Sequence, residues 1–255
     1  MNREEELFRN RLKDLAAASE RKQCPMFSDF LGLNEQNIFH SLERDLAFAH
    51  PVLFGGLPHS ERQMLGFLPD ALSFMPAQEL FPIHCIRIVP SDNRYAQELG
   101  HRDILGAVLH LGIDRCKTGD IRIGEHCAYL FAHEKMAPFI AENLIRVRHT
   151  PVTASVISLS SEQLPAVRTV RIEGSVPSPR IDALIPMAFH ASRSSMKELC
   201  AGGKVFRNGR LITDGSTHAV PGDIISVRGE GRFLFLEEGG TSKKGRIFVV
   251  LEKFV

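Results

Sequence analysis

Four runs near the C-terminus determine how we interpret the rest of this chain: Arg180-Ile181-Asp182-Ala183-Leu184, Ser192-Arg193-Ser194-Ser195-Met196-Lys197, Gly203-Lys204-Val205-Phe206-Arg207-Asn208-Gly209 and Pro221-Gly222-Asp223-Ile224-Ile225-Ser226-Val227-Arg228-Gly229. The first two open segments with apolar residues at helical spacing, which predicts two short amphipathic helices. The last two alternate apolar and polar residues around tight turns, as strands do. We therefore expect a small α+β module with basic side chains along one face.

Recognisable caps and turns bound these elements. Pro177-Ser178-Pro179 is predicted to be a stiff linker ahead of the module. Ser192 occupies an N-cap position, where its hydroxyl would accept a hydrogen bond from a backbone N–H of the second helix. Asn208-Gly209 predicts a two-residue hairpin. The last two strands are expected at residues 232–236 and 246–251.

The polar side chains of this module offer hydrogen-bond donors to phosphate oxygens. Arg and Ser at the start of a helix converge with its free N–H groups, and such contacts recognise folded RNA by shape and backbone. The opposing interpretation is that these are solvated charges, with Arg228 and Arg232 only flanking the turn at residues 229–231. The candidate RNA-binding residues are Arg180, Ser192, Arg193, Ser194, Lys197, Lys204, Arg207, Asn208, Arg228 and Arg232.

The distribution of charge supports an RNA partner. The whole chain has a net charge of +1, but residues 178–255 carry 12 Lys and Arg against 8 Asp and Glu. The preceding residues carry 19 against 22, a slight acidic excess. The basic excess therefore coincides with the candidate module, as expected for a surface that meets a polyanion.

The composition also argues against several other classes of protein. The five cysteines include no Cys-x-x-Cys, so neither a disulfide framework nor a zinc site is indicated, and a reduced, cytoplasmic setting is expected. The N-terminus lacks the apolar core of a signal peptide, and no apolar run approaches the ~20 residues of a membrane span. His40, His50 and His59 match no compact ligand spacing, so we expect no metal and no cofactor.

Residues 1–77 are predicted to form a helical region. Phe8, Leu12 and Leu15 lie at helical spacing and predict a helix over residues 3–23. A second helix is predicted from residue 34 until Pro51, because the residue before a proline disfavours the α conformation. A short helical turn is expected at residues 61–65.

Residues 78–176 are predicted to follow the order β-α-β-β-α-β, which suggests a ferredoxin-like unit. The same order occurs in the RRM, an RNA-binding domain whose sheet aromatics stack on bases. Tyr129 and Phe131 lie in one predicted strand, but the basic-Gly-aromatic run of that motif is missing, which favours a core role for both. The six elements are expected at residues 83–89, 103–111, 120–123, 127–131, 134–144 and 166–172.

The run from Leu99 to Gly106 places His101, Arg102 and Asp103 between two glycines, directly before a predicted helix. One interpretation is a helix start, with Asp103 near the positive end of the helix and Arg102 in solvent. The other is a loop that contacts a backbone phosphate. Sequence alone leaves both open.

Residues 178–232 contain five short motifs in a defined order: Arg-Ile-Asp-x-Leu, Ser-Arg-Ser-x-x-Lys-x-Leu, Gly-x-Val, Asn-Gly and Pro-Gly-Asp. At these spacings the motifs resemble the S4 RNA-binding domain. With five further runs, the chain resembles the YlmH family of bacterial S4-domain proteins over most of its length. These runs are Gly55-Gly56 followed by Glu61-Arg62, Leu99 to Gly106, Gly112-Ile113, Lys117-Thr118-Gly119-Asp120-Ile121 and Val227 to Phe233.

This resemblance implies a multidomain α+β protein with a helical region at 1–77, an RRM-like domain at 78–176 and an S4 domain at 177–255. The implied partners are structured rRNA or tRNA and the large ribosomal subunit. The implied role is ribosome-associated quality control, near peptidyl-tRNA on obstructed subunits. No membrane partner is implied, and we expect a monomer.

Enzymes can also carry S4 domains, so an RNA-modifying enzyme is the main alternative. A pseudouridine synthase would need a catalytic Asp in a Gly-Arg-Leu-Asp-type run, and a methyltransferase would need a Gly-rich cofactor loop after a strand. The sequence has neither feature, which favours a non-enzymatic RNA-binding protein. A protein-interaction scaffold remains possible as an additional role.

Overall fold

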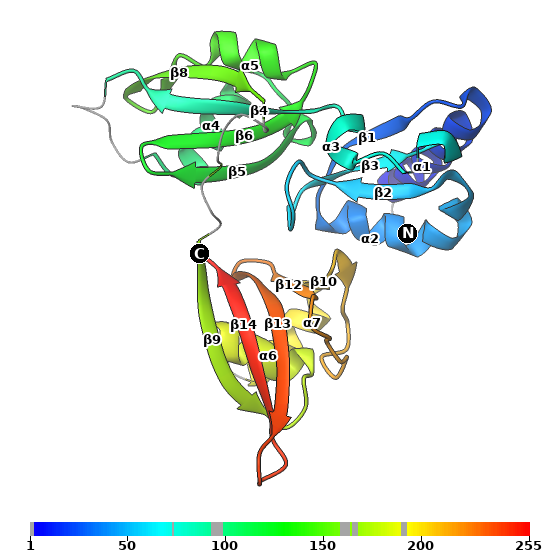
Figure 1. The fold of residues 1–255 in the computed structure, drawn as a ribbon, viewed down its shortest axis with the longest axis vertical. Helices are drawn as coiled ribbons and strands as arrows, with labels where there is room; N and C mark the ends of the chain where they lie inside the picture. Colours follow the sequence, from blue (N-terminus) through cyan, green and yellow to red (C-terminus); the bar gives the residue numbers. More distant parts are fainter. Residues whose placement is uncertain (1–2, 73, 93–98, 159–163, 165–167, 190–192) are drawn as a thin grey trace. The chain divides into compact units, whose positions relative to one another are not determined.

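The computed structural model describes residues 3–72, 74–92, 99–158, 164, 168–189 and 193–255, and for residues 193–195 and 197 it describes the backbone alone. The chain is a mixed α+β protein with two compact units, residues 1–166 and 167–255 (Figure 1). Within the described residues, no helix is both long enough and apolar enough to cross a membrane.

The N-terminal part of the first unit combines helices with a small sheet. Its strands form a three-stranded antiparallel sheet in the order β1-β3-β2. The helices pack on one face of this sheet through a core that includes Leu12, Phe39 and Leu65. The elements are α1 (Arg3–Lys22), β1 (Met26–Leu31), α2 (Leu33–Leu46), η1 (Ala47–Ala49), β2 (Pro51–Phe54) and β3 (Gln63–Phe67).

Both predicted helices are confirmed here, but the expectation of a purely helical region is wrong. The expected helical turn at residues 61–65 is also wrong, because the chain there enters β3. Leu65 and Phe67 face the helices, whereas Met64 enters a second core on the other side of the sheet. A strand buried on both faces shows no apolar alternation, so the sequence pattern did not reveal it.

The middle part of the first unit follows the order β-α-β-β-α-β, with one additional two-residue strand before the last. Its strands form one antiparallel sheet in the order β5-β6-β4-β8-β7. Short turns of helix precede it or connect its strands, namely η2 (Asp70–Leu72), α3 (Ala77–Leu80) and η4 (Arg115–Lys117). The main elements are β4 (Ile83–Pro90), α4 (His101–His110), β5 (Thr118–Gly124), β6 (Cys127–His133), α5 (Ala137–Asn143), β7 (Arg146–Val147) and β8 (Thr150–Ile157).

The last strand of this sheet lies earlier in the chain than predicted. It is β8 and not residues 166–172. Pro151 lies near the start of β8, and a proline weakens the sequence signal for a strand. Residues 169–176 form β9 (Thr169–Val176), which pairs with β14 (Ile247–Phe254) along its whole length. The second compact unit therefore begins before the expected boundary at residue 177, and Pro177-Ser178-Pro179 lies inside it.

The second unit packs two helices on one face of a six-stranded sheet, in the order β11-β10-β12-β13-β14-β9. The two predicted helices are confirmed. The predicted hairpin is also confirmed, because Asn208 and Gly209 have φ of 49° and 78° and Arg207 pairs with Arg210. The elements are α6 (Ile181–Phe189), α7 (Arg193–Ala201), β10 (Val205–Arg207), β11 (Arg210–Leu211), β12 (Ile224–Val227) and β13 (Gly231–Thr241).

The central strand β6 of the middle sheet is buried on both faces. Alternate residues of β6 from Ala128 onward join the core formed with α4 and α5. Tyr129 and Phe131 face the other way and pack with Phe30 of β1 and Met64 of β3. Their exposed fractions are 5% and 0%, so the predicted core role of both aromatics is confirmed. Neither ring is available to stack on a base.

Candidate nucleic-acid interface

The first group of candidate residues lies around the two helices of the second unit. Arg180 directly precedes α6, and Arg193, Ser194 and Lys197 occupy the first turns of α7. Ser192 lies outside the described residues, as do the side chains of Arg193, Ser194 and Lys197. For these four residues, the structure therefore supports only the backbone position of the last three.

Arg180 is partly engaged inside the protein. Its Nε donates to Oδ1 of Asp182 at 3.0 Å, and its Nη2 forms an ion pair with the second carboxylate oxygen. These contacts raise the pKa of Arg180. The guanidinium therefore stays charged, but an RNA phosphate would have to compete with Asp182 for it.

Arg207 and Asn208 help to hold the hairpin in place. Arg207 Nη1 donates to the backbone oxygen of His218 at 2.7 Å. Asn208 Nδ2 donates to Oδ1 of Asp223 at 2.7 Å, and its Oδ1 accepts the Ile224 N–H at 2.8 Å. The Asn208 amide thus ties the hairpin to the start of β12. The sequence pattern identified Asn208 as a turn residue but could not show this second role.

Lys204, Arg228 and Arg232 form a second group, at strand ends and on the outer face of the sheet. The Arg228 N–H donates to the Lys204 backbone oxygen at 2.9 Å, so these two exposed residues leave neighbouring strand ends. The Arg228 guanidinium lies 5.2 Å from the Phe206 ring centroid, and that of Arg232 lies 4.6 Å from Phe254. Both contacts are cation–π interactions, and they hold two arginines on the sheet face opposite the helices.

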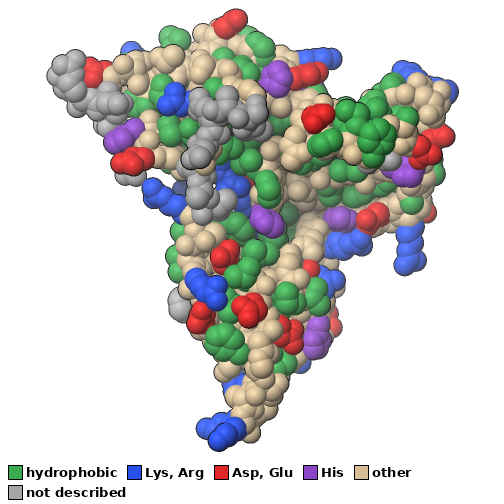
Figure 2. Space-filling model, in the orientation of Figure 1, with side chains coloured by type: hydrophobic (Ala, Val, Ile, Leu, Met, Phe, Trp, Pro, Cys, Tyr) green, Lys and Arg blue, Asp and Glu red, His purple; other side chains and the backbone are tan. Residues whose placement is uncertain are grey.

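The tip of the β13–β14 hairpin was not among the candidates predicted from the sequence. Figure 2 shows basic side chains at this projecting end of the second unit. Lys243 and Lys244 are exposed there, and Arg246 fixes the base of the tip by donating from Nε to Ser175 Oγ at 3.0 Å. A charged turn rich in glycine was the available signal.

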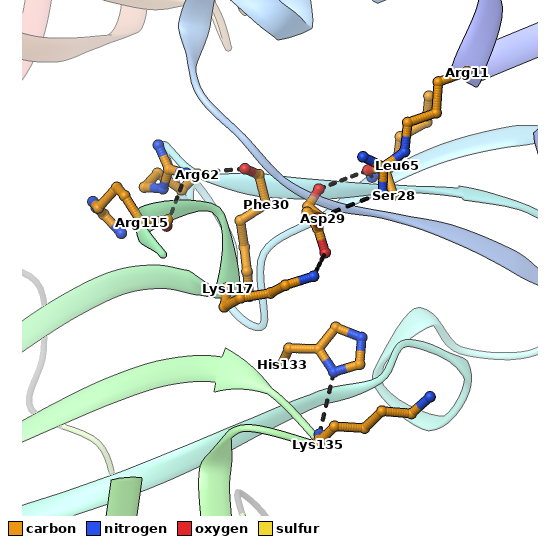
Figure 3. Close-up of polar contacts among 10 residues, drawn as sticks. All are labelled: Arg11, Ser28, Asp29, Phe30, Arg62, Leu65, Arg115, Lys117, His133 and Lys135. Atoms are coloured by element: carbon orange, nitrogen blue, oxygen red, sulfur yellow. Dashed lines mark hydrogen bonds and ion pairs between the residues drawn. The ribbon is translucent and has the colours of Figure 1, made fainter. Parts of the chain in front are cut away.

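A buried polar cluster joins the two sheets of the first unit (Figure 3). Arg62 donates to the backbone oxygens of Phe30 at 2.9 Å and Thr118 at 3.0 Å. Burial lowers the pKa of Arg62. Burial and the Arg62 charge lower the pKa of Arg115 to about 10. Arg115 therefore remains cationic at neutral pH, and the donors of both arginines satisfy buried carbonyls between β1 and β5.

The run from Leu99 to Gly106 forms the start of α4, as the first of the two interpretations expected. The helix begins at His101, and the Gly100 N–H donates to Oδ2 of Asp103 at 3.0 Å. Arg102 is exposed in the first turn. Within the described part of the chain, no group of three or more His, Cys, Asp or Glu side chains could hold a metal ion.

Comparisons with known proteins point to RNA and to the ribosome. Residues 76–161 match the family model described as "Putative RNA-binding domain in YlmH". The chain is 29% identical over 231 residues to the ribosome-associated protein quality control protein P2 of Bacillus subtilis, covering 89% of this chain and 86% of that protein.

The chain is thus similar to YlmH-type proteins over most of its length. A solved structure, the cell division protein ylmH from Streptococcus pneumoniae, matches with a TM-score of 0.52 and 18% identity. The match covers 64% of this chain and 96% of that structure, and it concerns the fold alone. The matched family model links residues 76–161, the middle part of the first unit, to RNA binding.

Proposed function

We propose that this YlmH-like protein is a non-enzymatic RNA-binding protein that docks on structured rRNA or tRNA. Its site of action is the large ribosomal subunit carrying peptidyl-tRNA, in ribosome-associated quality control in the cytoplasm, and it acts as a monomer. The observation that carries this proposal is the similarity, over 89% of the chain, to a relative named as a ribosome-associated quality control protein.

In this proposal the second unit is an S4 domain and the principal RNA contact. Two helices followed by an antiparallel sheet, with a helix start at Arg193, suit contacts to phosphates by N–H groups and basic side chains. Arg193 and Lys197 carry the contact, with Arg180, Ser192, Ser194, Lys204 and Arg207 around them. Arg228 and Arg232 extend it, and Asn208 shapes the hairpin beside it.

The middle part of the first unit is RRM-like in this proposal. The burial of Tyr129 and Phe131 favours docking through backbone and shape over base stacking. An RNA-modifying enzyme is the alternative, and it predicts incorporation of methyl label, or base isomerisation, in RNA treated with the purified protein. We expect neither product.

The proposal is tested by replacing Arg193 and Lys197 with Glu in the full chain. Glu in the first turns of a helix is compatible with the helix dipole, so the protein should stay folded. We expect the variant to be absent from the ribosomal fraction in co-sedimentation. Lys13→Glu/Lys135→Glu has the same change of charge at exposed positions of the first unit and should still co-sediment. Undiminished association of the Arg193/Lys197 variant would contradict S4 docking.

A further inference from the structure

The sheet of the middle part of the first unit offers RNA no aromatic stacking platform among the described residues. In the RRM, bases stack on aromatic side chains of the central strands. Here the corresponding rings, Tyr129 and Phe131, are packed against β1 and β3 and are 5% and 0% exposed. Residues 76–161 nevertheless match a family model described as an RNA-binding domain. RNA that binds this part of the chain must therefore be held without stacking on these rings, which directs attention to its basic surfaces.

The side of the sheet that carries the helices has a basic groove. It lies between α4 and the β7–β8 hairpin and has a volume of about 580 Å³. Arg102 enters it from the first turn of α4, Arg146 from β7, and Arg148 from the turn between β7 and β8. His110 and Asn143 also line it. Three arginines from separate elements thus line one concave surface.

The side chains that line the groove carry a net positive charge although they include one carboxylate. One oxygen of Asp103 accepts the Gly100 N–H at the helix start. The other lies 3.5 Å from Nε of Arg148, in an exposed ion pair, and such pairs contribute little stability. Arg102 and Arg146 are exposed in addition. The single acid therefore offsets one of three arginines.

The arginines of the hairpin are held by the fold. Val147, between them, is fully buried and pairs with Thr150. Arg148 has φ of 54°, a left-handed conformation that costs on the order of 1 kcal/mol or more for a residue with a side chain. The turn thus projects a charged side chain from a position where Gly or Asn would be less strained.

We propose that this groove is a second RNA-binding surface, in which Arg102, Arg146 and Arg148 contact backbone phosphates of structured RNA. Guanidinium groups suit phosphates because they can donate two parallel hydrogen bonds. Ile145, 72% exposed at the wall of the groove, provides an apolar contact for a ribose. The inference rests on the proposed RNA-binding function, and it adds a contact that does not depend on the second unit.

The test measures binding of the full chain to salt-washed large ribosomal subunits at several KCl concentrations. We compare the wild type, Arg102→Glu/Arg146→Glu and the charge-matched control Lys13→Glu/Lys135→Glu. The groove variant should bind more weakly, and its slope of log K against log salt should be shallower by about 1 for each phosphate that it no longer neutralises. The control should keep the wild-type slope. An unchanged slope in the groove variant would overturn the proposal.

Ultraviolet crosslinking of the same complexes, followed by mass spectrometry of RNA-linked peptides, separates the two claims. The groove predicts RNA adducts within residues 99–112 and 143–150. Adducts confined to residues 178–232 would overturn the groove and leave the proposed S4 docking intact. Absence of all RNA adducts together with absence of binding would contradict both. Protein crosslinks from the groove, in place of RNA adducts, would assign the surface to a protein partner and overturn the inference.

Discussion

His133 shows how a single side chain responds to the packing between the parts of the first unit. The Lys135 N–H donates to its Nδ1 at 3.2 Å, so this nitrogen accepts and the ring is neutral (Figure 3). Burial, and then the Lys117 charge, lowers the pKa of His133 below its ordinary 6.5. Protonation would remove the acceptor and place a second cation beside Lys117.

A pH dependence of stability follows from this shift. Because the pKa of His133 is lower in the folded than in the unfolded protein, the unfolded state binds more protons near pH 6.5. The contribution of His133 is present above pH 6.5 and disappears as the pH falls towards the folded pKa. We expect the free energy of unfolding in urea to fall less between about pH 7.5 and about pH 5 in His133→Gln than in the wild type. An equal or larger fall in the variant would contradict the assignment.

At the scale of elements, the close approach of two sheets defines the first unit. Gly119 of β5 makes this approach possible, because a Cβ there would lie 2.6 Å from Phe30 Cε1 and 3.2 Å from Phe131 Cβ. Gly106 in α4 is the converse case, since nothing lies within 4 Å of its hypothetical Cβ. One glycine is required by packing and the other is not.

These two glycines make a matched pair of variants. Gly119→Ala should lower the free energy of unfolding by about 1–3 kcal/mol, because it overpacks the contact between the sheets. Gly106→Ala should raise it by about 0.5–1 kcal/mol, because alanine is the better helix former. Urea denaturation of both variants measures the changes. A neutral or stabilising Gly119→Ala would contradict the close packing of the sheets.

The same elements show what could be predicted from the sequence. Helices with an apolar stripe and a clear stop, and a hairpin with Asn208-Gly209, carry local signals. The strands β1 and β3 do not, because they are short and buried on both faces. The identity of residues 169–176 depends on pairing with β14, far away in the sequence, and no local pattern specifies such a partner.

For the candidate site too, some features could be predicted from the sequence and others could not. The basic run of the second unit is local, so spacing and resemblance identified it. The internal bonds of Asn208 and the ion pair of Arg180 depend on residues brought together by folding. The groove at Arg102, Arg146 and Arg148 combines three elements, and only Arg102 carried a local signal.

At the scale of the whole molecule, the two proposals give one chain two RNA-contacting surfaces, one in each compact unit. Two linked contacts to the same RNA bind more tightly than either contact alone, because the second binding event is intramolecular. Such a design suits a protein that recognises an assembly of RNA by shape and needs no catalytic centre. In these proposals the second unit, where the basic excess of residues 178–255 lies, is the stronger anchor.

Crosslinking in cells followed by sequencing of the attached RNA tests the central claim most directly. The full chain should recover large-subunit rRNA and tRNA, and Arg193→Glu/Lys197→Glu should lose that enrichment while Lys13→Glu/Lys135→Glu keeps it. Reads spread over messenger RNA, or enrichment that survives in the Arg193/Lys197 variant, would contradict the proposed docking.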